Sequence, residues 1–320
     1  TTVVAIWFTK NYFDVPGPAW PTVDLEITEK DGTRINHVVR GPKGTTVKKA
    51  GGPCDVQIEN CHIKYVDGKY QLYFNDGKII YEATMTPTTP MWRPDTGIWN
   101  FGEGAEALEY GWFVAAPTAD VEGRLVIDGK ERKLKGKGYH DHNWGYTGLE
   151  NMMNHWYWGR AKVGDYTVIA CDIIAEEKYG NKRLPVFFIA KDGKILNDDA
   201  PITKIERANT HINDFTKKFM DDTLVYTQTV SPDEEYIITF ERKRDIMPRS
   251  LLEVVTPIKR FLGKLVGMNP TYMRVMGDVT VDVRRNGEQE KITETGLWEQ
   301  YFLGNNKEAT IEGVRYPVEA

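Results

Sequence analysis

Residues 70–85 read YQLYFNDGKIIYEATM and contain two runs rich in aromatic and β-branched residues. These runs, Tyr70–Phe74 and Lys78–Met85, flank the turn sequence Asn75-Asp76-Gly77, which predicts a β-hairpin. Further pairs of the same turn type separate similar runs along the chain: Asp31-Gly32, Asp67-Gly68, Asp128-Gly129, Asp192-Gly193 and Asn286-Gly287. Many short strands separated by such turns are typical of an antiparallel all-β sandwich or barrel.

The composition excludes several classes of protein. The chain has 320 residues, of which 41% are hydrophobic and 27% charged, as expected for a globular protein. Its formal charge is 41 − 46 = −5, which argues against nucleic-acid binding, because nucleic-acid proteins carry a basic domain or stripe. No apolar run is long enough for a transmembrane segment. We therefore expect a cytoplasmic protein, with a leader removed ahead of Thr1 as the alternative.

The cysteines do not define a disulfide framework, since the chain has only three. Cys54 and Cys61 are close enough in sequence to pair in an oxidising compartment, and reduced thiols are the other interpretation. The residues leave this choice open.

An internal repeat is suggested by residues 129–146, which align without gaps on residues 287–304 at an offset of 158. The alignment contains identities and conservative pairs: Gly129/Gly287, Lys133/Lys291, Gly138/Gly296, Leu134/Ile292, Asp141/Glu299 and Trp144/Phe302. Because the offset is about half the chain length, it predicts two similar β domains. We expect them to span residues 1–150 and 151–320.

One segment, residues 249–266, has helical periodicity and predicts an amphipathic helix with a kink at Pro257. Its basic residues allow two interpretations, namely a helix that covers a barrel and exposes its charges, or a helix that lies on a membrane. The acidic charge of the whole chain favours the first.

The chemical candidate is GYHDHNWG at residues 138–145. On a strand, His140, His142 and Trp144 would point one way, whereas Tyr139 and Asp141 would point the other way. Such a string suggests a metal site, acid–base chemistry or a structural polar network. We expect no metal, because the chain has no supporting ligand motif. The glycine-rich residues 102–107 do not predict a dinucleotide site, because they lack its strand and crossover helix.

This string, followed by HWYWGRA at residues 155–161, resembles the carotenoid 1,2-hydratase (hydroxyneurosporene synthase) and AttH-like superfamily. That group includes kievitone hydratase and decalin-forming Diels–Alderases. The resemblance implies two lipocalin-like antiparallel β-barrel domains in tandem, with an apolar pocket and no organic cofactor. It does not specify the reaction, because members catalyse hydrations or cycloadditions.

The resemblance also implies site residues. His142 and Trp144 match the family's His-x-Trp, and Asp172 matches the aspartate of a later Tyr-x-Asp. Ala170 stands where that tyrosine would be, which puts carotenoid hydration in question. We take as catalytic candidates His142, Asp172, His140 and Asp141, and as substrate-binding candidates Trp144, Tyr139, Trp156 and Trp158.

These residues support a chemical hypothesis. Asp172 lies in the apolar run at residues 168–174, where burial would keep a carboxylic acid protonated and able to donate a proton. Tryptophan rings would stabilise the resulting cation, and His142 would orient water. If the substrate is an enone, His140 or His142 would polarise its carbonyl group.

The expected function is that of a cofactor-independent enzyme acting on a hydrophobic isoprenoid, polyketide or polyphenol, as a hydratase or an isomerase/cyclase. The alternative is a lipocalin-like carrier or sensor that binds such a molecule without turnover. An enzyme would hold His142 and a carboxylate in the same cavity. The sequence leaves the substrate and the oligomeric state open.

Overall fold

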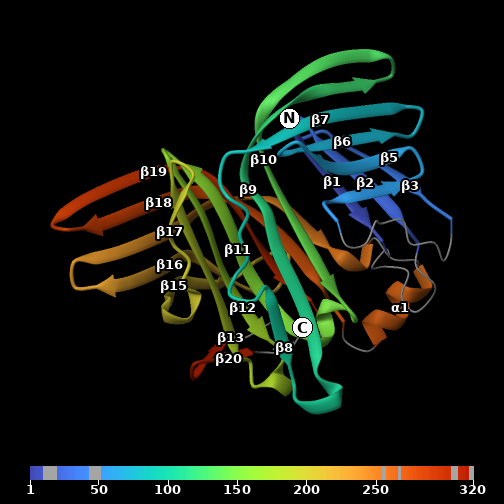
Figure 1. Ribbon diagram of the computed structural model, residues 1–320. Coiled ribbons are helices and arrows are strands. Elements are labelled where there is room, and N and C mark those ends of the chain that lie inside the picture. Colours follow the sequence, from blue (N-terminus) through green and yellow to red (C-terminus); the bar gives the residue numbers. More distant parts are fainter. Residues whose placement is uncertain (10–19, 43–51, 254–256, 266–267, 304–308, 317–320) are drawn as a thin grey trace. The chain divides into compact units, whose positions relative to one another are not determined.

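A computed structural model describes residues 1–9, 20–42, 52–253, 257–265, 268–303 and 309–316 (Figure 1). The described strands pair antiparallel, and the chain divides into two compact units. The first unit comprises Thr1–Thr88 and Thr118–His140, and the second comprises Thr89–Pro117 and Asp141–Ala320. The domain boundary expected between residues 150 and 151 stays a prediction.

The first unit contains a three-stranded sheet and strands of a seven-stranded sheet. The three strands are β1 (Thr2–Phe8), β2 (Thr22–Thr28) and β3 (Arg34–Arg40). The larger sheet is formed by β4 (Asp55–Ile58), β5 (Cys61–Val66), β6 (Lys69–Asn75), β7 (Ile79–Pro87), β9 (Leu108–Ile127) and β10 (Lys130–Gly145), and β8 (Ile98–Phe101) pairs with β9. Strands β9 and β10 each contribute residues to both units.

The hairpin predicted at residues 70–85 is confirmed as β6 and β7, in which Tyr70 pairs with Met85. Its turn is held by side chains, because Asp76 Oδ1 accepts hydrogen bonds from the backbone N–H groups of Lys78 (2.9 Å) and Ile79 (2.8 Å). Asn75 Oδ1 accepts another from Gly77. Short Asx side chains that satisfy the turn backbone in this way are the physical reason for the sequence signal.

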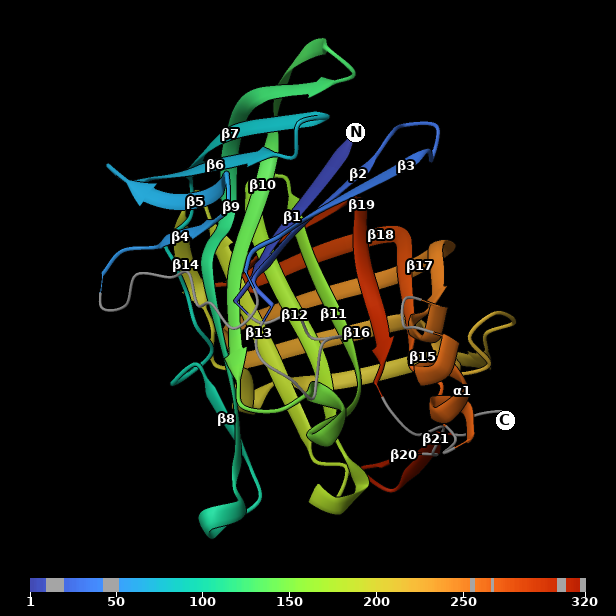
Figure 2. The same ribbon diagram turned by 90° about the vertical axis from the view of Figure 1, so that its right-hand side faces the viewer.

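The second unit contains a nine-stranded sheet in the order β14-β13-β12-β11-β19-β18-β17-β16-β15 (Figure 2). Its strands are β11 (Met153–Val163), β12 (Tyr166–Ala175), β13 (Arg183–Lys191), β14 (Lys194–Asn197), β15 (Lys204–Ile212), β16 (Phe219–Ser231), β17 (Glu234–Ser250), β18 (Thr271–Arg285) and β19 (Glu288–Phe302). The hairpin β20 (Ala309–Ile311) and β21 (Val314–Tyr316) follows.

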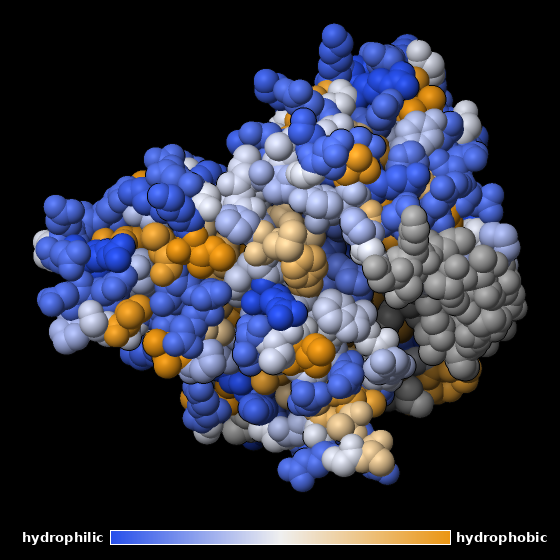
Figure 3. Space-filling view, viewed as in Figure 1, coloured by the Kyte–Doolittle hydropathy of each residue, from blue (hydrophilic) through white to orange (hydrophobic). Residues whose placement is uncertain are grey.

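One face of this sheet forms a hydrophobic core that includes Tyr157, Phe187, Phe240 and Trp298. Burial alternates along β18 from Thr271 to Val279, as expected when one side of a strand faces a core. Every residue of β12 is buried, which shows that both faces of the sheet are covered at this strand. Hydrophilic residues predominate where the β16–β17 and β18–β19 hairpins project at the left of Figure 3.

The two hairpins of the proposed repeat share local geometry. Asp128 and Gly129 between β9 and β10 have positive φ angles of 49° and 76°, and Asn286 and Gly287 between β18 and β19 have 52° and 81°. Two consecutive positive φ angles define the tight turn that suits the twist of a hairpin.

The matched glycines of the repeat also share an environment. A Cβ atom on Gly138 would lie 2.6 Å from Val121 Cγ2, and one on Gly296 would lie 2.3 Å from Val279 Cγ2. Both valines are again separated by the offset of 158. The same close approach of strand to valine explains why glycine occupies both positions.

The helix expected over residues 249–266 is shorter. Helix α1 spans Pro257–Leu265, β17 continues through Ser250, and Leu251–Glu253 forms one 3₁₀ turn. Residues 254–256 and 266–267 lie outside the described ranges. Pro257 is the first helical residue and does not kink the helix, because the first position needs no backbone N–H donor.

In the part of the chain that the structure describes, no helix is long and apolar enough to cross a membrane. Within the same residues, no group of three or more His, Cys, Asp or Glu is arranged to hold a metal ion. Cys54, Cys61 and Cys171 are free thiols.

Candidate active site

The GYHDHNWG string lies on β10, and its side chains alternate between two faces. Asp141 Oδ2 accepts a hydrogen bond from Trp112 Nε1 (2.9 Å), and Asn143 Oδ1 accepts one from the Tyr110 hydroxyl (2.5 Å). Asp141 and Asn143 therefore share a face with two aromatic residues of β9.

The other face of this string carries His142 and Trp144, whose rings stack with centroids 5.4 Å apart. His142 is exposed, and 41% of Trp144 is exposed. The Trp144 ring lies over Gly111, where a Cβ atom would come within 1.9 Å of it. His142 thus points away from the Asp141 carboxylate, and its catalytic role stays a prediction.

Two further candidates lie in the first unit. His140 is half-buried, and its ring meets the edge of Tyr70 at 4.7 Å. Tyr139 is also half-buried. Their roles stay predictions as well.

A second carboxyl group, Glu299 on β19, lies among aromatic side chains of the second unit. Its Oε1 atom accepts a hydrogen bond from Trp156 Nε1 (3.3 Å), and the Tyr272 hydroxyl also donates to Glu299. Arg274 Nε donates to the Tyr272 hydroxyl oxygen (3.0 Å). Trp156 stacks on Tyr301 with centroids 4.5 Å apart. The aromatic groups therefore orient the Glu299 carboxyl group.

The electrostatic setting of Glu299 favours its protonated form. Burial raises the pKa of Glu299, and the negative charge of Asp141 raises it further. The hydrogen bonds from Tyr272 and Trp156 and the charge of Arg274 lower this pKa, but they do not reverse the shift. Glu299 therefore holds its proton more tightly than an exposed glutamate does, chiefly because it is buried.

The same two carboxyl groups influence their neighbours. Burial raises the pKa of Cys171, and the charges of Glu299 and Asp141 raise it as well. Burial also raises the pKa of Tyr110, and the same two charges again add to the shift. Trp158 is paired in register with both Glu299 and Cys171. These residues consequently belong to one cluster, which also contains Trp156.

An aromatic wall continues from this cluster. The ring of Trp99 stacks on those of Tyr110 (5.7 Å) and Trp112 (6.1 Å). Trp92 meets Trp112 edge-on at 6.0 Å and lies 4.8 Å from Phe188 of β13. Such a surface suits an apolar ligand whose orientation is set by a few polar groups.

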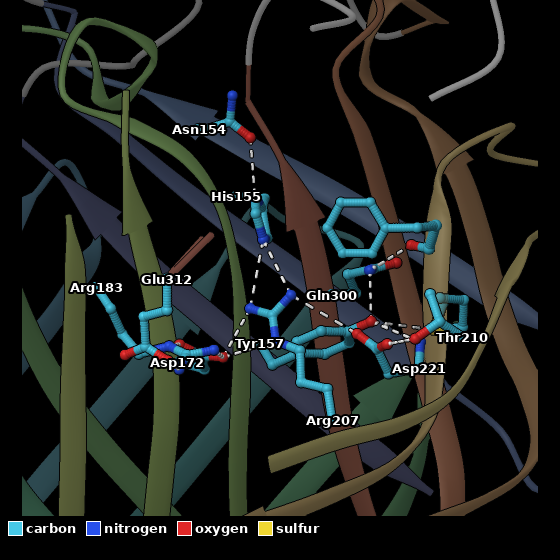
Figure 4. A network of polar contacts seen from close by, with 12 residues as sticks. Asn154, His155, Tyr157, Asp172, Arg183, Arg207, Thr210, Asp221, Gln300 and Glu312 are labelled. Atoms are coloured by element: carbon cyan, nitrogen blue, oxygen red, sulfur yellow. Dashed lines mark hydrogen bonds and ion pairs between the residues drawn. The ribbon is translucent and has the colours of Figure 1, made fainter. Parts of the chain in front are cut away.

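Asp172 belongs to a different network, drawn in Figure 4. It is fully buried, and its oxygens accept hydrogen bonds from Arg183 Nε (2.9 Å) and Arg207 Nε (2.7 Å). Arg207 also forms an ion pair with Asp221 at 3.6 Å. Hydrogen bonds between a carboxylate and guanidinium groups are charge-assisted and stronger than those between neutral groups.

His155 and Tyr157 complete this network. Nε2 of His155 lies 3.4 Å from both terminal nitrogens of Arg207, and burial lowers the pKa of His155, so its ring is neutral. The Tyr157 hydroxyl accepts hydrogen bonds from the Asp221 backbone N–H (2.8 Å) and from Gln300 Nε2 (2.7 Å).

The register of the sheet separates Asp172 from Glu299. Tyr157 pairs with Asp172 and with Gln300, whereas the next residue, Trp158, pairs with Cys171 and with Glu299. Because adjacent residues of a strand point to opposite faces, Asp172 faces the core and Glu299 faces the other side. The structure brings together Asp141, Trp156 and Trp158 of the candidates, and it does not bring Asp172 to them.

Sequence reasoning missed Glu299, Tyr272 and Arg207. A signal for Glu299 was present, because the repeat aligns it with Asp141. Nothing local marked Tyr272 or Arg207, because the carboxyl groups that they contact, Glu299 and Asp172, lie on other strands.

Part of the chain is similar to a known protein family. Residues 105–229 match the family model described as carotenoid hydratase CrtC. The quinolone epoxide rearrangement protein asqO of Emericella nidulans is 36% identical over 172 residues, which cover 51% of this chain and 46% of that protein. A second such protein, penF of Penicillium thymicola, is 35% identical over 83 residues, or 26% of this chain and 22% of that protein.

The acyclic carotenoid 1,2-hydratase of Rhodobacter capsulatus is 34% identical over 98 residues, which cover 30% of this chain and 33% of that enzyme. The chain thus spans less than half the length of each of these curated relatives.

Solved structures share the fold at low identity. Kievitone hydratase from Nectria haematococca is 15% identical with a TM-score of 0.53, over 94% of this chain and 83% of that one. CghA bound to Sch210972 is 12% identical with a TM-score of 0.60, over 94% and 84%. An AttH-like protein from Nitrosomonas europaea is 14% identical with a TM-score of 0.55, over 90% and 82%. The expected all-β, lipocalin-like fold is confirmed.

The matched residues contain the whole GYHDHNWG string and the following HWYWGRA. Residues 105–229 are thus similar to the carotenoid hydratase CrtC family, and the resemblance expected from these motifs is confirmed.

Proposed function

We propose that this protein is a cofactor-independent enzyme that protonates a hydrophobic small molecule, with Glu299 as the acid and Asp141 as its charged partner. The observation that carries the proposal is the half-buried Glu299, whose pKa is raised by burial and by Asp141. A carboxylic acid kept protonated near neutral pH can donate a proton to an alkene, an epoxide or a carbonyl oxygen.

The neighbouring groups suit the cation that protonation creates. The ring of Trp156 would stabilise a positive centre by about 2 kcal/mol when water is excluded. The carboxylate of Asp141 adds a Coulomb attraction and can accept a proton. If Asp141 removes a proton from a neighbouring carbon, the outcome is isomerisation or cyclisation. If it removes one from attacking water, the outcome is hydration. In both cases one proton is delivered by Glu299 and one is taken up by Asp141.

The relatives support this class of reaction. They include a carotenoid 1,2-hydratase and quinolone epoxide rearrangement proteins, whose names describe a hydration and a rearrangement. For this chain we propose an isoprenoid, polyketide or polyphenol substrate and hydratase or isomerase/cyclase activity.

The remaining candidates keep distinct places in the proposal. Trp158 is proposed to line the site beside Glu299, and Asp172 to position β12 and β13 through its two arginines. His142, His140, Tyr139 and Trp144 are retained as candidates because the family motif includes them, and they are tested by alanine variants in the same assay.

The test replaces Glu299 by glutamine and, as the matched control, Glu288 of the same strand, which is exposed. Purified protein is incubated with a panel of alkenes, epoxides and enones in ¹⁸O-labelled water, and products are followed by mass spectrometry. We expect Glu299→Gln to lower kcat by about 10²–10⁴-fold without loss of substrate binding, and Glu288→Gln to leave kcat unchanged. Wild-type turnover in Glu299→Gln would exclude this acid. Binding without turnover by the wild type would indicate a carrier.

The pH profile tests the role of Asp141. A general acid is active below its pKa, so the rate falls as pH rises through the pKa of Glu299. Because Asp141 raises that pKa, Asp141→Asn should move the falling limb of the profile to lower pH. An unmoved limb would show that Asp141 does not act on the catalytic acid.

A further inference from the structure

Helix α1 turns large apolar side chains toward solvent. Phe261, Leu262 and Leu265 are 63%, 54% and 67% exposed. Scattered exposed hydrophobic residues are common, but three within five positions of one short helix form a contiguous patch. This differs from the expectation that the apolar side of this segment covers a barrel.

The helix contacts the rest of the protein through a small residue. Gly263 is buried, and a Cβ atom at this position would lie 3.4 Å from Leu252 Cδ2. Arg260 Nε donates a hydrogen bond to the backbone carbonyl of Leu252 (2.8 Å). The attachment therefore uses glycine and a backbone hydrogen bond and leaves Phe261, Leu262 and Leu265 outside.

The helix is also cationic in an acidic protein. It contains Lys259, Arg260 and Lys264 and no acidic residue, whereas the whole chain has a formal charge of −5. Lys264 is exposed in the last turn, beside Leu265. A short helix with bulky apolar residues and cations suits the boundary between lipid headgroups and acyl chains.

We propose that α1 is a docking element for an anionic lipid surface, with Phe261, Leu262 and Leu265 inserted among the acyl chains and Lys264 against headgroup phosphates. Charge complementarity selects an anionic bilayer, since each Lys or Arg gains from the negative surface potential. A second copy of this chain would bring one cationic helix against another.

The size of the patch also argues for lipid. The three side chains expose roughly 300–400 Å² of apolar surface, whereas a stable protein interface needs about 800 Å² from each partner. A bilayer has no such minimum, because it deforms around individual side chains. The proposal is independent of the reaction proposed above, although a membrane is where an apolar substrate accumulates.

The experiment is co-sedimentation of the full chain with vesicles of phosphatidylcholine alone and of phosphatidylcholine with phosphatidylglycerol. We expect binding to the anionic vesicles that weakens as salt is added. The double variant Leu262→Gln/Leu265→Gln should lose at least tenfold in partitioning. Its matched control is Ile202→Gln, because Ile202 is 52% exposed and lies elsewhere in the second unit.

The contribution of the basic residues is tested by comparing Lys264→Gln with Lys204→Gln, which removes an exposed lysine of β15. Lys264→Gln should weaken binding to anionic vesicles severalfold, and Lys204→Gln should not. Circular dichroism establishes that each variant is folded. The proposal is overturned if the wild type does not bind anionic vesicles, or if the Leu262→Gln/Leu265→Gln variant binds them as well as Ile202→Gln does. It is also overturned if size-exclusion chromatography shows a dimer that the leucine variant dissociates.

Discussion

Replacing Arg207 by methionine should destabilise the folded protein strongly, because two buried carboxylates depend on this cation. Arg207 is 1% exposed at its side chain, and its NH2 nitrogen lies 2.6 Å from the fully buried Asp172. The other terminal nitrogen of Arg207, Nη1, lies 3.6 Å from Oδ2 of the buried Asp221. Methionine preserves an apolar stem against the rings of Tyr157 and Tyr316, which now lie 5.1 and 5.0 Å from the guanidinium carbon.

The magnitude follows from the charge left behind. Asp172 keeps Arg183 as a partner, but Asp221 loses its cation. Burial already raises the pKa of Asp221, and Arg207 lowers it, so the substitution raises it further. A buried aspartate without a cation can become protonated on folding. Protonation lowers the free energy of unfolding by about 4 kcal/mol at pH 7 and by about 1.5 kcal/mol at pH 5. Breaking a buried pair costs about 3–5 kcal/mol in general, which agrees with the value at pH 7.

The sign of the pH dependence is therefore defined. A carboxyl group whose pKa is raised in the folded state destabilises at high pH, and the destabilisation is relieved as pH falls below that pKa. The difference between Arg207→Met and the wild type should be larger at pH 7 than at pH 5.

Urea unfolding, followed by tryptophan fluorescence at both pH values, measures this difference. The control is Lys204→Met on the same strand, whose exposed side chain should contribute less than about 1 kcal/mol. A loss below about 1 kcal/mol in Arg207→Met at pH 7, or equal losses at both pH values, would refute the assignment of Arg207 as the cation of a buried network.

Two further predictions concern stability. Burial lowers the pKa of Lys218 to about 8, and the side chain is 1% exposed with no acceptor for its ammonium group among the described residues. Lys218→Met should therefore stabilise the protein by roughly 2–3 kcal/mol at pH 7. Wild-type stability should rise from pH 8 to pH 10, because the unfolded chain binds more protons than the folded one in this range. Urea unfolding measures this stability, and a stability that does not change with pH would contradict the prediction. Gly296→Ala should lower the free energy of unfolding by about 1–3 kcal/mol, because the new Cβ would lie 2.3 Å from Val279 Cγ2. The control Gly136→Ala, whose Cβ would have no atom within 4 Å, should leave the thermal melt unchanged. Similar losses of stability in both variants would contradict the packing argument.

Much of the fold was predictable because its determinants are local. Turn pairs such as Asp128-Gly129 and Asn286-Gly287 can adopt positive φ angles cheaply, and that property is readable without coordinates. The repeat was visible for the same reason, since its glycines are required by a contact that recurs at the same offset. The length of α1 was overestimated, because an apolar period of 3.6 does not say where a long strand such as β17 ends.

The sequence by itself determined the strands, the turns, the family resemblance and the position of a chemical string on alternating faces of one strand. Only the tertiary structure decided which carboxyl groups meet. The strand register places Asp172 on the core face, where it contacts Arg207. It places Glu299 on the opposite face, where Asp141 raises the pKa of Glu299. The physical reason is that turn and strand preferences depend on neighbouring residues, whereas burial and charge coupling depend on distant partners. Arg207 lies 35 residues from Asp172, and Glu299 lies 299 − 141 = 158 residues from Asp141.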